Sequence, residues 1–132
     1  MKTIEVVAAI IKQDNKIFTT RRGSGEFENM WEFPGGKIEA GETREEALIR
    51  EIKEELELDI DITKYLTTVD YDYSTFHLTM HCFTCVISGG KLNLNAHNDA
   101  KWTTLEELDK FNWVPADILV IEKLKEYEGN NK

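Results

Sequence analysis

Three glutamates, Glu51, Glu54 and Glu55, are spaced so that a helix would bring their carboxylates together on one face. Like charges at these offsets repel each other, so the cluster indicates that a cation lies between them. Carboxylate oxygens suit hard divalent cations such as Mg²⁺ or Mn²⁺. Judged from its composition alone, a helix with so many charges more often presents them to solvent. That alternative stays open at this point.

The residues around the glutamates predict such a helix. Thr43 is followed three residues later by Glu46, which is the capping-box spacing at a helix start. Arg50 lies four residues from both Glu46 and Glu54, so it can pair with either. Apolar residues recur every four positions and predict the buried face: Leu48, Ile52 and Leu56. Glu55 lies close to this face, where a site would be partly desolvated.

Length and composition predict one domain over residues 1–128, with 129–132 as a frayed tail. A formal charge of −9 argues against a partner such as duplex nucleic acid or an anionic membrane. It does not exclude a phosphate substrate, because metal ions and a few local Arg or Lys side chains can offset it. No stretch resembles a signal peptide or a membrane span, so we expect a cytoplasmic protein.

The two cysteines, Cys82 and Cys85, have the CxxC spacing of zinc ligands, but no second pair completes a site. They fall in an expected strand, where residues three apart face opposite ways. We therefore favour free buried thiols over a redox or metal role.

The elements expected around the helix are mostly strands. Residues 3–11 read as a strand buried on both faces, and 17–20 as its return. A long antiparallel pair covers 66–73 and 76–87. A turn at 88–90 and a polar loop at 93–99 precede a short strand at 100–103. The last helix covers 115–127, with an expected apolar stripe of Ile118, Val120, Ile121 and Leu124.

Several residues outside the helix could bind a ligand. Arg22 ends a strand, and a surface arginine there is usually just solvated unless a phosphate site lies beside it. Trp31 and Phe33 alternate around Glu32 and should face the core. The aromatic side chains near residues 71–76 either pack together or stack on a planar ligand.

The stretch from Gly36 to Leu58 resembles the Nudix box, the signature of the Nudix hydrolases. That pattern is Gly, five residues, Glu, seven residues, Arg-Glu, an aliphatic residue, any residue, Glu-Glu, any residue, Gly and an aliphatic residue. It is matched by Gly36, Glu42, Arg50, Glu51, Ile52, Glu54, Glu55 and Leu58. Glu57 replaces the last glycine. If that position is left-handed, the replacement costs about 1 kcal/mol but removes no expected metal ligand.

The resemblance extends over nearly the whole chain and is greatest to the MutT subfamily. It implies an α/β fold, the Nudix fold, in which a mixed β-sheet is sandwiched between α-helices. It also implies a Mg²⁺-dependent pyrophosphohydrolase, with Mn²⁺ as a possible substitute, that converts a nucleoside triphosphate and water into the monophosphate and diphosphate. The expected substrates are (d)CTP or modified nucleotides such as 8-oxo-dGTP, which would make the enzyme part of nucleotide-pool sanitation.

The resemblance also assigns site residues. The metal ligands would be the Gly36 carbonyl, Glu51, Glu54 and Glu55, with Asp99 as an uncertain further acid because the alternative register places Ala96 there. Glu51 and Glu54 would be catalytic, with Arg50 and Glu42 supporting the loop and helix. Substrate would be bound by Arg22, Lys37, Phe76 and Asp117.

Asp117 stands where MutT itself has an asparagine. An ionised carboxylate only accepts hydrogen bonds, which suits the exocyclic amine of cytosine and also the protonated N7 of 8-oxoguanine. The identity of the preferred base therefore stays open. Two other functions also stay open: a Nudix enzyme for another diphosphate, such as ADP-ribose, and a non-catalytic nucleotide-sensing module. Whether the chain is a monomer or a homodimer also stays open.

Overall fold

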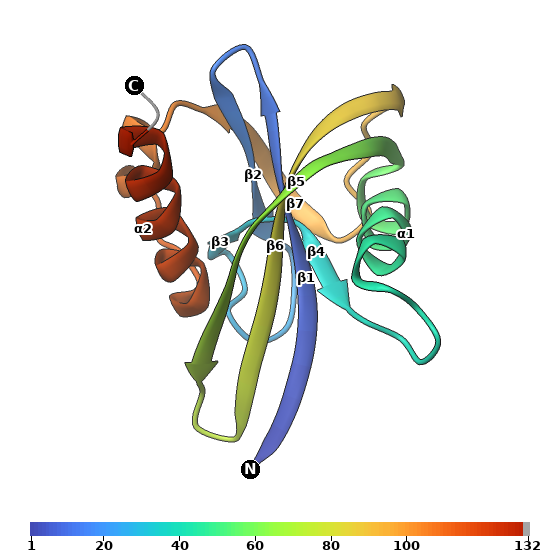
Figure 1. Ribbon diagram of the computed structural model, residues 1–132, viewed down its shortest axis with the longest axis vertical. Coiled ribbons are helices and arrows are strands. Elements are labelled where there is room, and N and C mark those ends of the chain that lie inside the picture. Colours follow the sequence, from blue (N-terminus) through green and yellow to red (C-terminus); the bar gives the residue numbers. More distant parts are fainter. Residues whose placement is uncertain (131–132) are drawn as a thin grey trace.

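A mixed β-sheet lies between two helices, as expected (Figure 1). The computed structural model describes residues 1–130. The helices, which lie on opposite sides of the strands, are α1 (Arg44–Leu56) and α2 (Pro115–Asn130). A 3₁₀ helix, η1, spans Glu106–Lys110. The strands are β1 (Lys2–Gln13), β2 (Lys16–Arg22), β3 (Trp31–Glu32), β4 (Gly35–Lys37), β5 (Leu58–Asp72), β6 (Phe76–Gly90) and β7 (His97–Thr103).

β1 is the central strand of the sheet. The strand order is β3-β2-β1-β6-β5, with β4 also paired to β1 and β7 also paired to β2. β1 runs parallel to β6 and antiparallel to its other partners, which makes the sheet mixed. Val7 and Ala9 face α1, while Ala8 and Ile10 face α2, so the prediction of a strand buried on both sides is confirmed.

The β1–β4 pairing depends on a glycine. A Cβ added at Gly35 would lie 1.9 Å from the Val7 carbonyl oxygen, so only glycine allows this approach. Pro34 just before it accepts a hydrogen bond from the Ala9 amide at 2.8 Å. β4 is thereby fixed against the centre of the sheet, and Gly36 lies next to α1.

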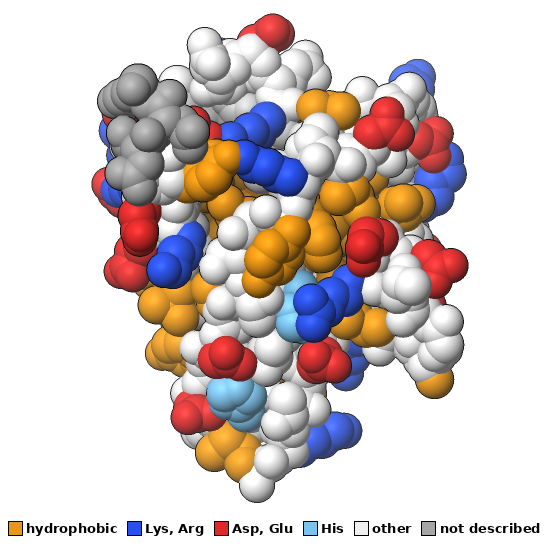
Figure 2. Space-filling view, viewed as in Figure 1, with side chains coloured by type: hydrophobic (Ala, Val, Ile, Leu, Met, Phe, Trp, Pro, Cys, Tyr) orange, Lys and Arg blue, Asp and Glu red, His pale blue; other side chains and the backbone are white. Residues whose placement is uncertain are grey.

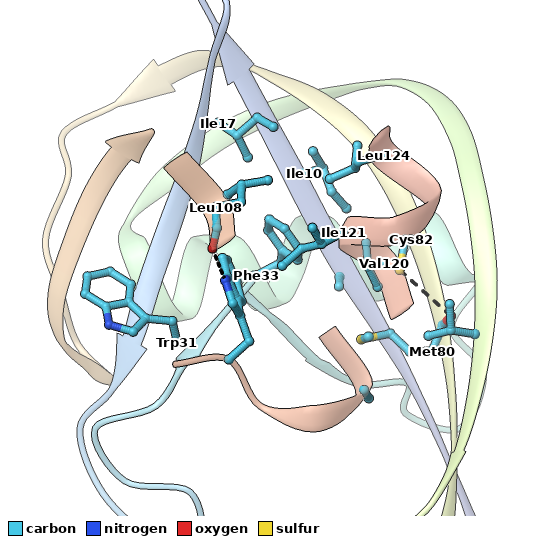
Figure 3. Close-up of a cluster of buried hydrophobic side chains, with 14 residues drawn as sticks. Ile10, Ile17, Trp31, Phe33, Met80, Cys82, Leu108, Val120, Ile121 and Leu124 are labelled. Atoms are coloured by element: carbon cyan, nitrogen blue, oxygen red, sulfur yellow. Dashed lines mark hydrogen bonds between the residues drawn. The ribbon is translucent and has the colours of Figure 1, made fainter. Parts of the chain in front are cut away.

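Two apolar clusters hold the layers together. On the α2 side, Ile10, Phe33, Val120 and Leu124 pack with other buried side chains, and Figure 3 shows them converging between strand and helix. On the α1 side, the predicted stripe of Leu48, Ile52 and Leu56 is fully buried. Burial of one such side chain contributes about 1.5–3 kcal/mol. Ile118 was expected in the buried stripe of α2, and this prediction is wrong. Ile118 is 46% exposed, because Ala116, Val120 and Leu124 form the face of α2 that meets the sheet.

Both ends of α1 are held by side chains. The Thr43 hydroxyl accepts from the Glu46 amide at 3.1 Å, and the Glu46 carboxylate accepts from the Thr43 amide at 2.9 Å, so the capping box is confirmed. At the other end, Glu57 is left-handed with φ 57°. Its Oε2 accepts hydrogen bonds from the side-chain amides of Asn93 at 2.6 Å and Asn95 at 3.1 Å.

Several boundaries differ from the sequence-based expectation. β5, expected at 66–73, already begins at Leu58. Residues 88–90 continue β6 instead of turning, because Gly90 pairs with Leu58 at the start of β5. β7 begins at His97, so Asp99 lies in a strand and not in a loop. α2 continues to Asn130 and includes two residues expected in the tail, and residues 131–132 lie outside the described part.

Other expectations concern the surface and the cysteines. Both cysteines are buried free thiols, as predicted. None of the helices within residues 1–130 has the length and apolar character needed to cross a membrane. Among the described side chains on the face in Figure 2, acidic and basic groups are interspersed, including those over α1.

The left-handed residue after α1 gives a stability test. Glu57→Gly and Glu57→Ala both remove the hydrogen bonds to Asn93 and Asn95, but only alanine keeps a Cβ at positive φ. We expect the glycine variant to be more stable than the alanine variant by about 1 kcal/mol. Urea denaturation of the two proteins measures this difference. Equal stability would mean that the left-handed conformation is not retained in solution.

Candidate active site

A pocket of about 330 Å³ lies between the α1 and α2 layers. It is lined by residues from β1, β2, β3, β4, both helices, the β5–β6 hairpin and connecting loops. Seven residues that the sequence singled out line it: Arg22, Gly36, Lys37, Glu51, Glu55, Phe76 and Asp117. A larger groove, of about 560 Å³, lies at the β1–β2 turn, but none of the predicted site residues lines it, and Lys12 and Glu128 form an ion pair there. The smaller pocket is therefore the candidate site.

One end of the pocket is acidic and poorly hydrated. Burial raises the pKa of Glu55 to about 8, and the nearby charges of Glu32 and Glu51 add to the effect. Glu55 Oε1 accepts a hydrogen bond from the Gly35 amide at 3.2 Å. Burial also raises the pKa of Glu51. A Cβ added at Gly36 would lie 2.4 Å from the Glu51 carboxylate, so a side chain there would force the Glu51 carboxylate to move.

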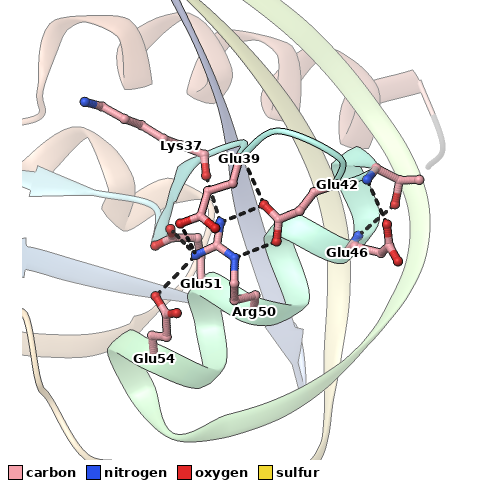
Figure 4. A network of polar contacts seen from close by, with 8 residues as sticks. Lys37, Glu39, Glu42, Glu46, Arg50, Glu51 and Glu54 are labelled. Carbon is pink, nitrogen blue, oxygen red and sulfur yellow. Dashed lines mark hydrogen bonds and ion pairs between the residues drawn. The ribbon is translucent and has the colours of Figure 1, made fainter.

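Arg50 organises the outer side of these acids (Figure 4). Its guanidinium donates to both carboxylate oxygens of Glu42, at 2.6 and 2.9 Å, and to Glu51 Oε1 at 2.8 Å. It also donates to Glu54 Oε2 at 3.3 Å and to the Lys37 carbonyl at 3.0 Å. The hydrogen bond from Arg50 lowers the pKa of Glu42 to about 2. Arg50 therefore pairs with Glu54 and not with Glu46, whose carboxylate is used in the capping box.

The donor set at the acidic end fits a hard divalent cation. Glu51 and Glu55 are desolvated carboxylates directed to one pocket, and a cation there would stabilise their ionised forms. Within residues 1–130, no three His, Cys, Asp or Glu side chains already converge on one point. Arg50 binds oxygens of Glu51 and Glu54, and the Glu54 side chain is 60% exposed outside the pocket. The four-residue metal set stays a prediction, and its assembly would require these side chains to turn.

On its α2 side the pocket combines a buried carboxyl with aromatic side chains. Asp117 Oδ2 accepts from the Phe33 amide at 2.8 Å. Its complete burial, with Glu32 nearby, raises the pKa of Asp117 well above its usual range. Tyr73 stacks on Phe76, with 5.1 Å between ring centroids, and also meets Phe27 at 5.3 Å. A flat ring and a buried polar group suit a planar, hydrogen-bonding ligand.

Asp99 is not brought to the pocket. It pairs with Arg21 across β2 and β7, and its Oδ1 accepts from the Ala100 amide at 2.8 Å. The pairing of these strands shifts at this point, so that His97 lies opposite Arg22. This β-bulge changes the alternation of side chains and turns Asp99 away from His97. We therefore do not include Asp99 in the site.

Glu32 and Phe27 are among the pocket residues that the sequence reasoning missed. Glu32 lines the pocket beside Glu55, and its position between two core aromatics, Trp31 and Phe33, already implied that it faces the other way. Phe27 also lines the pocket and has an unusual positive φ of 66°. No periodic pattern marks a single loop aromatic, so the sequence offered no signal for it.

The sequence is similar to known proteins over most of its length. The family model described as NUDIX domain matches residues 1–124. CTP pyrophosphohydrolase of Escherichia coli K12 is 35% identical over 92% of this chain and 91% of its own length. 8-oxo-dGTP diphosphatase of the same organism is 33% identical over 95% of this chain and 98% of its own. The chain therefore belongs to the NUDIX domain family.

A solved structure is similar to this chain over nearly its whole length. The solution structure of the Escherichia coli ORF135 protein superposes with a TM-score of 0.87 at 33% identity, covering 97% of this chain and 92% of that one. The ADP-ribose pyrophosphatase of Methanocaldococcus jannaschii is 39% identical over 72% of this chain, which covers 56% of that protein's length. The predicted enzyme class, a Nudix hydrolase, is confirmed.

The raised pKa of Glu55 predicts a pH-dependent stability. The unfolded carboxyl titrates near 4.5 and the folded one near 8, so the folded protein binds the extra proton between these values. Stability from this group is therefore present at low pH and lost as the pH rises toward 8. Glu55→Gln should remove the loss, and its stability relative to wild type should rise by on the order of 4 kcal/mol from about pH 5 to about pH 8.5.

The measurement is urea denaturation of both proteins at the two pH values, with a chelator present. Glu45→Gln is the matched control, because Glu45 is exposed in the first turn of α1 and should show no such change. A difference that is independent of pH would contradict the buried state of Glu55.

Proposed function

We propose that this chain is a nucleoside triphosphate pyrophosphohydrolase that releases the monophosphate and diphosphate with the help of Mg²⁺ or Mn²⁺. One observation carries the proposal: a single pocket holds the partly desolvated carboxylates of α1, basic side chains, and a buried polar group with aromatic side chains. This arrangement matches a ligand with a charged polyphosphate and a planar base. The names of the two similar Escherichia coli enzymes agree with it.

The acidic end would hold the divalent cation through Glu51, Glu54, Glu55 and the Gly36 carbonyl. When bound, such a cation neutralises phosphate charge and lowers the pKa of bound water. Glu51 and Glu54 then serve as the carboxylates that orient the attacking water and accept its proton. Arg50 and Glu42 act indirectly, by fixing the loop before α1 against the helix.

The phosphates would be bound by Arg22 and Lys37, the two basic side chains that line the pocket. Arg22 is suited to this because its planar fork can bind two phosphate oxygens at once. The base would then lie between Asp117 and the ring of Phe76, which Tyr73 supports by stacking. Burial raises the pKa of Asp117 in the free pocket, and its oxygen that is not bound to the Phe33 amide would accept a hydrogen bond from the base.

The first test is turnover. With Mg²⁺, the purified protein should release pyrophosphate from at least one of dCTP, CTP, 5-methyl-dCTP, 8-oxo-dGTP and dGTP. Glu54→Gln keeps the side-chain size but removes one negative charge, and should lower kcat by about 100-fold or more. Glu45→Gln makes the same chemical change at an exposed position of the same helix and should leave kcat unchanged.

ADP-ribose belongs in the same panel. The similarity to the Methanocaldococcus jannaschii enzyme makes it the second candidate substrate. Hydrolysis of ADP-ribose alone would overturn the triphosphate proposal. Inactivity toward every substrate, with binding retained, would favour a nucleotide-sensing module.

Asp117→Asn tests the choice of base. The Phe33 amide needs an acceptor, so the asparagine oxygen should face Phe33 and its NH₂ group should face the ligand. That donor would oppose the exocyclic amine of cytosine. We expect kcat/KM for dCTP to fall about tenfold or more relative to that for 8-oxo-dGTP. Because both values are measured on the same variant, their ratio cancels any general loss of activity. An unchanged ratio would mean that Asp117 takes no part in base recognition.

A further inference from the structure

A buried histidine adjoins the pocket and has no part in the proposed reaction. The His97 side chain is 1% exposed, and its Nε2 lies 3.0 Å from Glu32 Oε2. Within the described residues, its Nδ1 is buried without a hydrogen-bond partner. The ring is therefore held by one polar contact, and that contact is to a pocket carboxylate.

The strand pairing puts His97 and two pocket residues on one face of the sheet. β2 lies between β3 and β7, with Thr20 opposite Glu32 and Arg22 opposite His97. Thr20 and Arg22 are two residues apart and so share a face. The bulge beside Arg22 gives His97 this position in place of Asp99.

The protonation of the ring follows from its partners. The Glu32 carboxylate accepts, so Nε2 carries the proton. Nδ1 is then an unprotonated acceptor, which costs less to bury unpaired than a donor would. The Nε2–H group of His97 is thus the group that binds Glu32.

Glu32 connects His97 to a second pocket residue, Arg22. Its other oxygen, Oε1, lies 3.7 Å from Nη1 of Arg22. The negative charge of Glu32 also contributes to the raised pKa values of two other pocket carboxyls, Glu55 and Asp117. A carboxylate in this position disturbs phosphate binding if it turns toward the ligand, and supports it if it stays on Arg22.

We propose that His97 is a positioning residue that holds Glu32 in place, so that Glu32 directs the guanidinium of Arg22 toward the substrate phosphates. The phosphate-binding role of Arg22 rests on the proposed function. The simpler alternative is a histidine that only fills space beneath β3.

Two substitutions separate these readings. His97→Met introduces an apolar side chain of similar length and removes the N–H donor. His97→Gln keeps a donor that can reach Glu32. We expect His97→Met to raise the KM for the triphosphate about tenfold, with kcat within about twofold, and His97→Gln to restore most of the loss. An equal effect of both substitutions would indicate space-filling only and overturn the proposal.

A double-mutant cycle tests the route through Glu32. In the Glu32→Gln background, His97→Met should have little further effect on KM, because the carboxylate that His97 positions is already gone. Additive effects of the two changes would overturn the proposal. If His97→Met does not fold, His97→Asn takes its place, because its amide is too short to reach Glu32.

A readout without substrate keeps the proposal separate from the proposed function. In ¹⁵N NMR spectra of the free protein, His97 should show a protonated Nε2 and an unprotonated Nδ1. The Arg22 Nε–H resonance should move in both His97→Met and Glu32→Gln, while that of exposed Arg44 stays fixed. An unmoved Arg22 signal would overturn the positioning role. Wild-type inactivity on every triphosphate, with Arg22 moving as expected, would refute only the proposed function.

Discussion

The guanidinium of Arg50 is the interaction on which the site depends. Four glutamates, at positions 39, 42, 51 and 54, lie within 4 Å of it, and without a cation between them their charges would repel. Its bond to the Lys37 carbonyl ties β4 to the helix as well. Because Arg50 fixes the outer side of the cluster, the loop before α1 keeps one shape, and Glu51 and Glu55 stay directed to the pocket.

The packing of α1 then decides how deep each acid lies. Leu48, Ile52 and Leu56 are completely buried under the sheet, so the helix cannot rotate without losing apolar contacts. With the helix fixed, Glu55 reaches the Gly35 amide and Glu51 lies against Gly36. Desolvation of these two carboxyls is the energetic cost of such a site, and a bound cation would offset it.

Local signals in the sequence were reliable guides. The capping box and the apolar stripe of α1 each depend on residues close together in the chain, and each was found as predicted. The errors lie where distant segments meet. Ile118 was placed in the core from helical spacing alone, and Asp99 was placed in the site without knowledge of the β2–β7 pairing.

The sequence by itself determined the α1 helix, its row of carboxylates and the glycines that let them approach the backbone, because helical periodicity and steric limits act within a few residues. Tertiary structure alone decided which acids face the pocket, that Asp117 is fully buried, and that Glu32 meets His97. These features depend on strand register and on one bulge, and a shift of a single residue sends a side chain to the opposite face.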